Sequence, residues 1–473
     1  MKKFTKILLI GCLLVMVSCN NWLDVDPKSQ VKDKDLFASE MGFKEALSGV
    51  YSLMTKEGLY GKELTFGWLG VLGQEWTSVP YNYEDDQKYD FENAASEVRI
   101  DSVWTGLYNA IANANKLLKE LEGKENLFSG DNYFIIKGEV LALRAYLHFD
   151  LLRIFGASCT VGMERIAIPY VTEYAPTIFP QEKVGDFVGK VLNDLQDAAK
   201  CLENDPILTG RTVSEIDDNG YLMNRQVHLN YYAVKGLMAR VYLYKGDYAN
   251  AEVCAKEVIG SGCFEWVKQE NLTNESVADL TFSTEHLFAL NIVTLGNIVD
   301  KYLDGGNNSF ALEESRLSEY YGSSYDYRYL YLFKTGVGMS NTLRYLKKYD
   351  QLESVSWAQS YRNKLPLICL PEMYYILAEC RYHSSGDVLE PLNEVCRHRG
   401  VADLSEADLS AFETLLLAEY RKEVIGGGQL FFQYKRLNRS VVPGTDVDLA
   451  GEGRYVIPMP KEELENPGWV SNQ

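Results

Sequence analysis

Two groups of aromatic residues lie in segments whose sequence does not favour a helix. The first group is Trp76, Tyr81 and Tyr83, with Asn82 between the tyrosines. The second group is Tyr320, Tyr321 and Tyr325. Exposed aromatic rings stack on the C–H faces of neutral sugars while amide groups bind the hydroxyls, and peptides are held by similar surfaces. These seven residues are therefore predicted to contact an oligomeric ligand. The alternative is that the rings pack the loops or face another protein.

Motifs of enzymatic chemistry are absent from the sequence. There is no His-Glu-x-x-His zinc motif, no Gly-x-x-x-x-Gly-Lys-Ser/Thr phosphate loop, no complete Gly-x-Gly-x-x-Gly and no Gly-x-Ser-x-Gly elbow. The five histidines are scattered along the chain, and among 66 acidic residues some pair resembles a glycosidase dyad by chance. The sequence thus predicts no catalytic residue, no metal site and no cofactor.

The N-terminus has the pattern of a bacterial lipoprotein signal. Lys2, Lys3 and Lys6 precede the apolar run 7–17, which is too short to span a bilayer. A small residue then stands directly before Cys19. We expect Cys19 to become the acylated first residue and to anchor an otherwise soluble body, because acyl chains bind bilayers stably. The alternative is an ordinary secretory signal followed by an incidental cysteine.

Composition and charge narrow the classes of partner. With 473 residues, of which 46% are hydrophobic and 12% aromatic, the chain can bury a large core. Its formal charge of −19 repels phosphate backbones, so no nucleic-acid partner is expected. Seven cysteines follow Cys19 at irregular spacing without any Cys-x-x-Cys, which argues against a disulfide framework and leaves room for one incidental disulfide.

Helical periodicity supplies the elements that must position the aromatic groups. Apolar residues recur on one helix face over 103–121 and 140–155, and Gly156 is placed to end the second helix. Small residues around Gly246, and again around Gly386, follow the order of a tetratricopeptide hairpin or of any closely packed helix pair. Residues 271–350 are rich in glycine, asparagine, serine and tyrosine, which predicts long loops with a few short strands.

Two charged groups have structural interpretations. Asp326-Tyr327-Arg328 is expected to form an ion-paired turn that orders its loop. Lys435, Arg436 and Arg439 are expected to form a charge cluster at a helix end.

Several segments, in fixed order, resemble the SusD/RagB family. They include Cys19 with Leu23-Asp24-Val25-Asp26-Pro27, then Trp104, Tyr108, Ile111 and Asn115, then Arg144-Ala145-Tyr146 ending in Phe155-Gly156, then Leu392-Asn393-Glu394-Val395, then Glu419, Arg421 and Glu423, and finally Ile457-Pro458 and Asn466-Pro467. The chain departs from the family's Glu-Gly-x-Arg at Gly427-Gly428-Gln429-Leu430, which indicates a divergent subgroup.

The resemblance implies a mostly α fold, in which a tetratricopeptide-like helix-pair scaffold carries a loop-rich ligand face and a few short strands. The expected organisation is a signal peptide at 1–18, a lipidated tether at 19–34 and a single SusD-like domain at 35–473. It further implies a cell-surface lipoprotein of the outer membrane. Such a protein would bind an oligosaccharide and deliver it to a TonB-dependent SusC-like barrel.

Alternatives of other classes stay open at this point. The same architecture could capture a peptide or glycopeptide, since aromatic surfaces accept both. A lipid-anchored glycan hydrolase would show turnover. A helical-repeat scaffold that binds only proteins would associate with the barrel without binding any small ligand.

Overall fold

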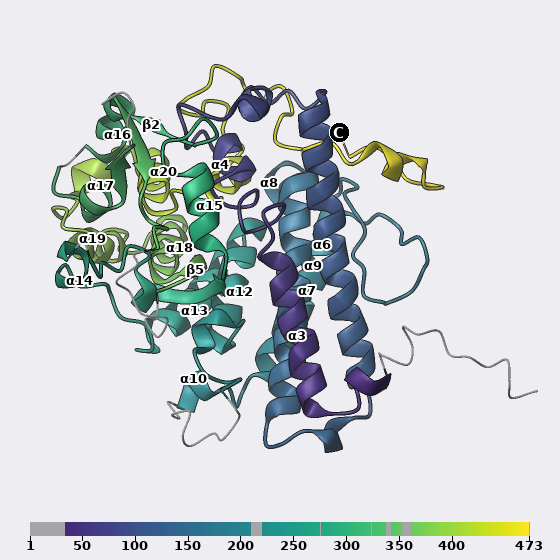
Figure 1. Cartoon of the computed structure of the whole chain (residues 1–473). Coiled ribbons are helices and arrows are strands. Elements are labelled where there is room, and N and C mark those ends of the chain that lie inside the picture. The colour runs from purple at the N-terminus through teal and green to yellow at the C-terminus, as the bar shows by residue number, and fades with distance from the viewer. Residues whose placement is uncertain are drawn as a thin grey trace, which may run out of the picture.

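A computed structural model describes residues 34–209, 220–274, 276–322, 324–336, 342–351 and 361–472. Helices make up most of this part of the chain, with a few short strands (Figure 1), which confirms the predicted fold class. The predicted lipidation site Cys19 lies outside the described residues, as does the tether up to residue 33. Within the described ranges, no helix combines the length and the apolar character needed to cross a bilayer.

Four long helices lie side by side in one half of the molecule (Figure 1). They are α3 (Glu40–Met54), α6 (Ala94–Leu121), α7 (Asn132–Phe155) and α9 (Val184–Cys201). The helices predicted over 103–121 and 140–155 are confirmed within α6 and α7, although both begin earlier. α6 starts at Ala94 because the Asn93 side chain accepts hydrogen bonds from two backbone N–H groups of the first turn. Gly156 directly follows the end of α7, as predicted.

The second half of the chain contributes helix pairs. Its helices are α12 (Tyr231–Lys245), α13 (Tyr248–Ile259), α18 (Leu370–His383), α19 (Leu389–His398), α20 (Phe412–Glu423) and α21 (Leu430–Arg436). The two predicted hairpins are confirmed as α12 with α13 and as α18 with α19. Gly246 follows the end of α12 with a left-handed backbone conformation, at φ +81°. Residues that carry a side chain rarely adopt this conformation, whereas glycine adopts it readily. The buried Ala239, Ala251 and Ala255 let α12 and α13 pack closely.

Strands and short helices fill the connections. β1 (His286–Asn291) pairs antiparallel with β5 (Lys364–Cys369). β2 (Leu312–Glu313), β4 (Leu343–Leu346) and β3 (Phe333–Thr335) form a second antiparallel sheet in the order β2-β4-β3. The short helices are α4 (Trp68–Leu72), α5 (Glu84–Gln87), α8 (Cys159–Gly162), α10 (Pro206–Thr209), α14 (Glu270–Thr273), α15 (Leu295–Tyr302), α16 (Glu314–Tyr321) and α17 (Tyr327–Tyr331). The region predicted as loops with short strands therefore also contains short helices.

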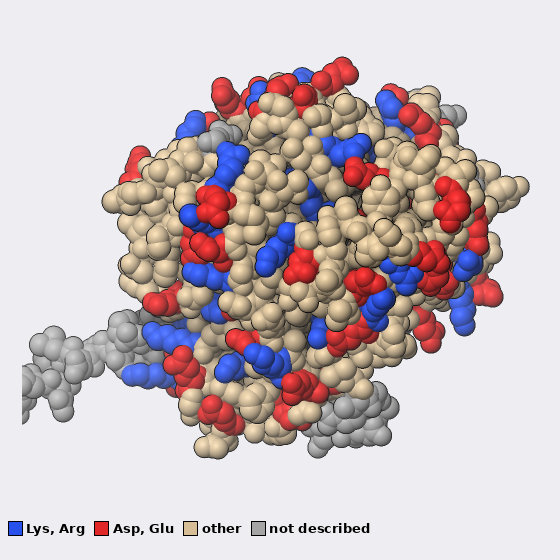
Figure 2. All heavy atoms as spheres, turned by 180° about the vertical axis from the view of Figure 1, so that it is seen from behind, with Lys and Arg blue, Asp and Glu red and all other residues tan. Residues whose placement is uncertain are grey.

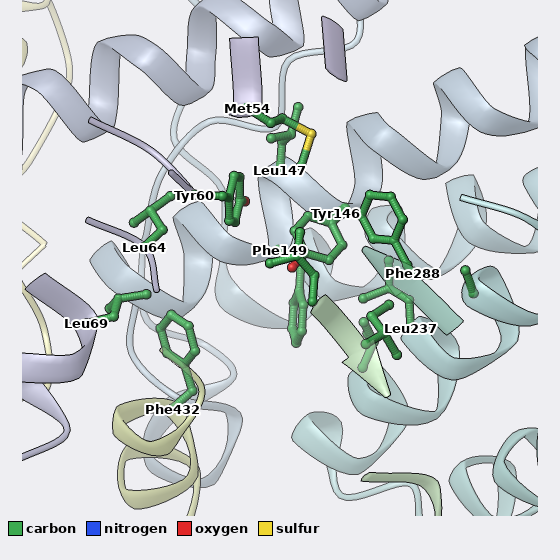
Figure 3. Close-up of a cluster of buried hydrophobic side chains, with 14 of the residues drawn as sticks. Met54, Tyr60, Leu64, Leu69, Tyr146, Leu147, Phe149, Leu237, Phe288 and Phe432 are labelled. Atoms are coloured by element: carbon green, nitrogen blue, oxygen red, sulfur yellow. The ribbon is translucent and has the colours of Figure 1, made fainter. Parts of the chain in front are cut away.

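One hydrophobic core connects the two halves. Tyr146 and Phe149 of α7 lie near Phe288 of β1 and Leu237 of α12 (Figure 3). The rings of Tyr146 and Phe288 are 6.1 Å apart in an edge-to-face arrangement. Trp104, on the apolar face of α6, is buried. The seven described cysteines are all free thiols, and four of them are buried.

Several arginines are buried against carboxylates. Arg436 donates from Nη1 and Nη2 to both oxygens of Glu379, at 2.6 and 2.7 Å. The predicted ion-paired turn is confirmed, because Arg328 Nη2 lies 2.7 Å from an Asp326 oxygen, and both residues are buried. The predicted charge cluster at a helix end needs correction. Lys435 and Arg436 do lie in the last turn of α21, but their side chains are inside the protein.

Candidate functional site

The segment that carries the first aromatic group follows α4 and packs against the turn before β2. Within it, Trp76 is only 2% exposed. Its Nε1 donates to the Phe66 carbonyl at 2.7 Å, and its ring lies 6.0 Å from the Phe310 ring. The expectation of an exposed Trp76 ring is therefore wrong, because the ring fills the core beneath the loop.

Tyr83 is buried in the same region. Its hydroxyl donates to Glu63 Oε1 at 2.8 Å, and the Arg99 guanidinium lies 3.9 Å from the centre of its ring. Burial, together with the charge of Glu63, raises the pKa of Tyr83 above its ordinary value. Because the ring is buried and in contact with a cation, the expectation of an exposed Tyr83 ring is also wrong.

Tyr81 and Asn82 are the members of the first group at the surface. Tyr81 is 87% exposed and opens a short 3-10 turn, η1 (Tyr81–Tyr83), after Pro80. Asn82 is exposed as well, and its carbonyl accepts a hydrogen bond from Arg99 Nη2 at 3.1 Å. The buried arginine thus fixes the backbone beneath Tyr81.

The second group divides in the same way. Tyr321 is buried, and its hydroxyl donates to the Lys422 carbonyl at 3.1 Å, so the expectation of an exposed ring is wrong there too. Tyr320 is half-buried and lies over the Arg421 guanidinium at 4.3 Å. Tyr325 is 77% exposed in the turn between α16 and α17. Two of the three rings thus retain some access to solvent.

Backbone hydrogen bonds join the two groups. The N–H groups of Thr77 and Ser78 both donate to the Ala311 carbonyl at 3.0 Å, and Ala311 N donates back to the Ser78 carbonyl. Glu313 N donates to Thr77 Oγ1 at 2.7 Å. The loop of the first group is therefore attached to the strand that leads directly into α16. Figure 1 shows α4, β2 and α16 at the same end of the molecule.

We call the surface formed by residues 77–82, 305–322 and 324–325 the tyrosine face. The antiparallel bridge between Ser78 and Ala311 places the loop that carries Tyr81 beside the segment leading into α16, and Tyr325 follows the end of α16. The exposed turn 306–308, with two asparagines, adds amide groups beside them.

Arg421 of α20 is buried beneath the tyrosine face and contacts Tyr320 and the start of the first loop. Its Nη1 donates to the Gln74 carbonyl at 2.9 Å, and Nη2 donates to the Tyr434 hydroxyl. With Tyr320 lying over it, the buried Arg421 connects the start of the first loop to α16. The sequence resemblance placed Arg421 in a late helix without a role at the site. Its charge alone gave no signal of one.

Glu75, which precedes the first group, is fully buried. Its Oε2 accepts a hydrogen bond from Gly426 N at 2.7 Å. Burial raises the pKa of this carboxyl to about 7, against the lowering effects of the Gly426 N–H and of Arg421. Glu75 therefore shapes the loop and does not reach a ligand.

Other kinds of site were sought in the described ranges. Within them, no group of three or more histidine, cysteine, aspartate or glutamate side chains is arranged to hold a metal ion. Figure 2 shows basic and acidic side chains interspersed over the face turned away from the viewer of Figure 1. The tyrosine face is thus the site that the predicted residues define.

Comparison with known protein sequences finds similarity to SusD-like proteins. Residues 21–243 match a family described as starch-binding and associating with the outer membrane. A SusD-like protein of Formosa agariphila is 25% identical over 269 residues, which are 56% of this chain and 47% of that protein. A second SusD-like protein of the same organism is 25% identical over 149 residues, covering 29% of this chain and 28% of the relative. The chain thus spans about half or less of the length of these relatives.

Solved structures resemble the whole fold. A SusD superfamily protein from Bacteroides thetaiotaomicron has a TM-score of 0.74 at 21% identity, covering 92% of this chain and 100% of that one. A SusD-like carbohydrate binding protein from Bacteroides vulgatus has a TM-score of 0.66 at 17% identity, covering 85% and 84%. A laminarin binding SusD-like protein has a TM-score of 0.65 at 18% identity, covering 91% and 100%.

The paired helices give this chain the helical-repeat fold of the solved SusD superfamily structures. Over residues 21–243 the chain is thus similar in sequence to the SusD-like family, and over most of its length it has the fold of SusD superfamily structures.

Proposed function

We propose that this protein captures an oligosaccharide at the cell surface and delivers it to a partner TonB-dependent, SusC-like barrel. The match to a family described as starch-binding carries the proposal, and the laminarin binding neighbour supports a glucan as ligand. No bond is broken in this function. The protein would hold the ligand and leave its cleavage and transport to others.

The tyrosine face suits an extended neutral ligand. Tyr81 and Tyr325 offer exposed rings on two segments that the bridge between Ser78 and Ala311 connects, and Tyr320 of α16 is half-buried. The two rings stand on separate segments of the chain, so an extended oligomer is the ligand that we expect to contact both. Asn82 and the exposed turn 306–308 supply hydrogen-bonding groups for hydroxyls.

Attachment to the outer membrane would come from Cys19. An acylated Cys19 followed by the tether 19–34 would keep the body close to the barrel. Metabolic labelling with a fatty acid should mark the protein and should leave Cys19→Ala unlabelled. Labelling that persists in Cys19→Ala would contradict the proposed anchor.

Ligand capture is tested by calorimetric titration of the full-length protein with maltooligosaccharides, laminarioligosaccharides and short peptides. Saturable binding of a glucan without a change in its chain length is expected. Binding of peptides alone would favour peptide capture. Shortening of the glucan would instead identify a hydrolase.

A further inference from the structure

A cavity lies away from the tyrosine face, where α8 and the end of α21 meet the segment 449–456. Its volume is about 340 Å³. Small-molecule sites range from about 300 to 1,000 Å³, so this cavity suits a ligand of roughly monosaccharide size. The polar residues in its wall include Ser158, Arg165, Lys435, Asn438, Glu452 and Arg454.

Ser158 is 2% exposed, and its hydroxyl has no hydrogen-bond partner among the described residues. A buried hydroxyl without a partner costs about 1 to 3 kcal/mol, so such groups are rare in folded proteins. The Ser158 hydroxyl lies in the wall of the cavity, where a ligand oxygen could accept its hydrogen bond.

Lys435 is 1% exposed. Its Nζ donates to the Ile154 carbonyl at 3.1 Å, and no carboxylate of the described residues lies within ion-pair distance. An ammonium has three N–H groups, so a neutral carbonyl satisfies only part of it. Burial and the nearby charge of Arg153 lower the pKa of Lys435 well below its ordinary value, a condition that a bound anion would relieve.

The charges around the cavity favour an anion. Three of its lining residues, Arg165, Lys435 and Arg454, are basic, and the single carboxylate of the wall, Glu452, lies 3.4 Å from Arg454; a bound anion would favour the protonated form of Lys435. This local excess of positive charge occurs in a chain whose formal charge is −19. Buried cations are often paired, as Arg436 is with Glu379, whereas Lys435, like Lys348 and Arg421, has no carboxylate within ion-pair distance among the described residues; of these three, Lys435 lines this cavity.

We propose that this cavity binds a small organic acid of monosaccharide size, whose carboxylate meets Lys435 Nζ and the Ser158 hydroxyl. A uronic acid and an acidic amino acid share this chemistry. The site is separate from the tyrosine face, and its occupancy does not depend on glycan binding there.

Calorimetric titration of the full-length protein with D-galacturonate, L-glutamate and neutral D-galactose tests the site. At least one of the two acids should bind saturably and raise the melting temperature, whereas galactose should do neither. Preference for galacturonate would identify a sugar acid, and preference for glutamate an amino acid. Absence of binding by both acids, or equal binding of galactose, would overturn the proposal.

Two variants locate the binding. Ser158→Ala should raise the dissociation constant of the acid about tenfold, as expected for a lost hydrogen bond to a charged group. Lys435→Met, which keeps the length of the side chain, should weaken it at least as much. Arg397→Gln, which removes a half-exposed arginine outside the cavity wall, is the control. Unchanged affinity in Ser158→Ala and in folded Lys435→Met would place the acid elsewhere and refute the assignment.

Discussion

Glu75 should make the stability of the protein depend on pH in a direction opposite to that of a salt-bridged carboxylate. One of its oxygens accepts from Gly426 N at 2.7 Å, and the other has no partner among the described residues. Burial raises its pKa from an ordinary 4.5 to about 7. Replacing Glu75 with Gln keeps the acceptor for Gly426 and removes the titration.

The sign follows from the two protonation states. Below pH 4.5 the carboxyl is protonated in both the folded and the unfolded chain, so its titration contributes nothing. Between 4.5 and about 7 the unfolded chain ionises while the native carboxyl keeps its proton. The free energy of unfolding therefore falls by about 1.4 kcal/mol for each pH unit, or ~3 kcal/mol in all, and levels off above pH 7.

Urea unfolding of the unsubstituted chain and of Glu75→Gln measures this effect between pH 5.5 and 8, above the isoelectric point near 4.9. Over this window the stability of Glu75→Gln relative to the unsubstituted chain should rise by about 2 kcal/mol. Glu84→Gln, at an exposed glutamate of α5, is the control for loss of one carboxylate. A difference that stays flat or falls with rising pH would refute the reasoning.

Arg421→Met should lower the free energy of unfolding by about 2 kcal/mol, because the Gln74 carbonyl loses its donor in a buried site; a urea midpoint equal to that of the unsubstituted chain would contradict this. Gly246→Ala should cost about 1 to 2 kcal/mol from backbone strain alone, since the space around Gly246 is open; thermal unfolding measures it, and an unchanged melting temperature would argue against the left-handed turn. Arg436→Met should cost about 3 to 5 kcal/mol by leaving the Glu379 carboxylate buried without its partner; chemical denaturation should show that Glu379→Gln combined with Arg436→Met recovers part of the loss.

The helices were predictable because their apolar residues repeat at helical spacing. The pattern over 140–155 places residues on one face, and the alanine and glycine order around Gly246 identifies a hairpin. The first residues of the helices were harder to predict. α6 begins after the polar cap Asn93, and this part of the helix lies before the stretch whose apolar residues repeat at helical spacing. The short α15 and α16 were missed because their surroundings are rich in glycine and asparagine.

Loop residues were harder to place. Tyr81 and Tyr83 are two positions apart in the same segment, yet one is exposed and the other is buried against Arg99. A loop has no period that tells the two environments apart, because burial there depends on what packs against it from distant parts of the chain. The contact between Ser78 and Ala311 is such a case, with more than two hundred residues between its partners.

The most direct test of the account is the affinity of the doubly substituted Tyr81→Ala/Tyr325→Ala protein for the glucan bound by the unsubstituted chain. Loss of two stacking rings should weaken binding at least about tenfold, which corresponds to ~1.4 kcal/mol, without changing the melting temperature. Tyr174→Ala, at a tyrosine of similar type that is 48% exposed outside the tyrosine face, should bind normally. Equal affinity of the double variant and the unsubstituted chain would contradict glycan capture by the tyrosine face.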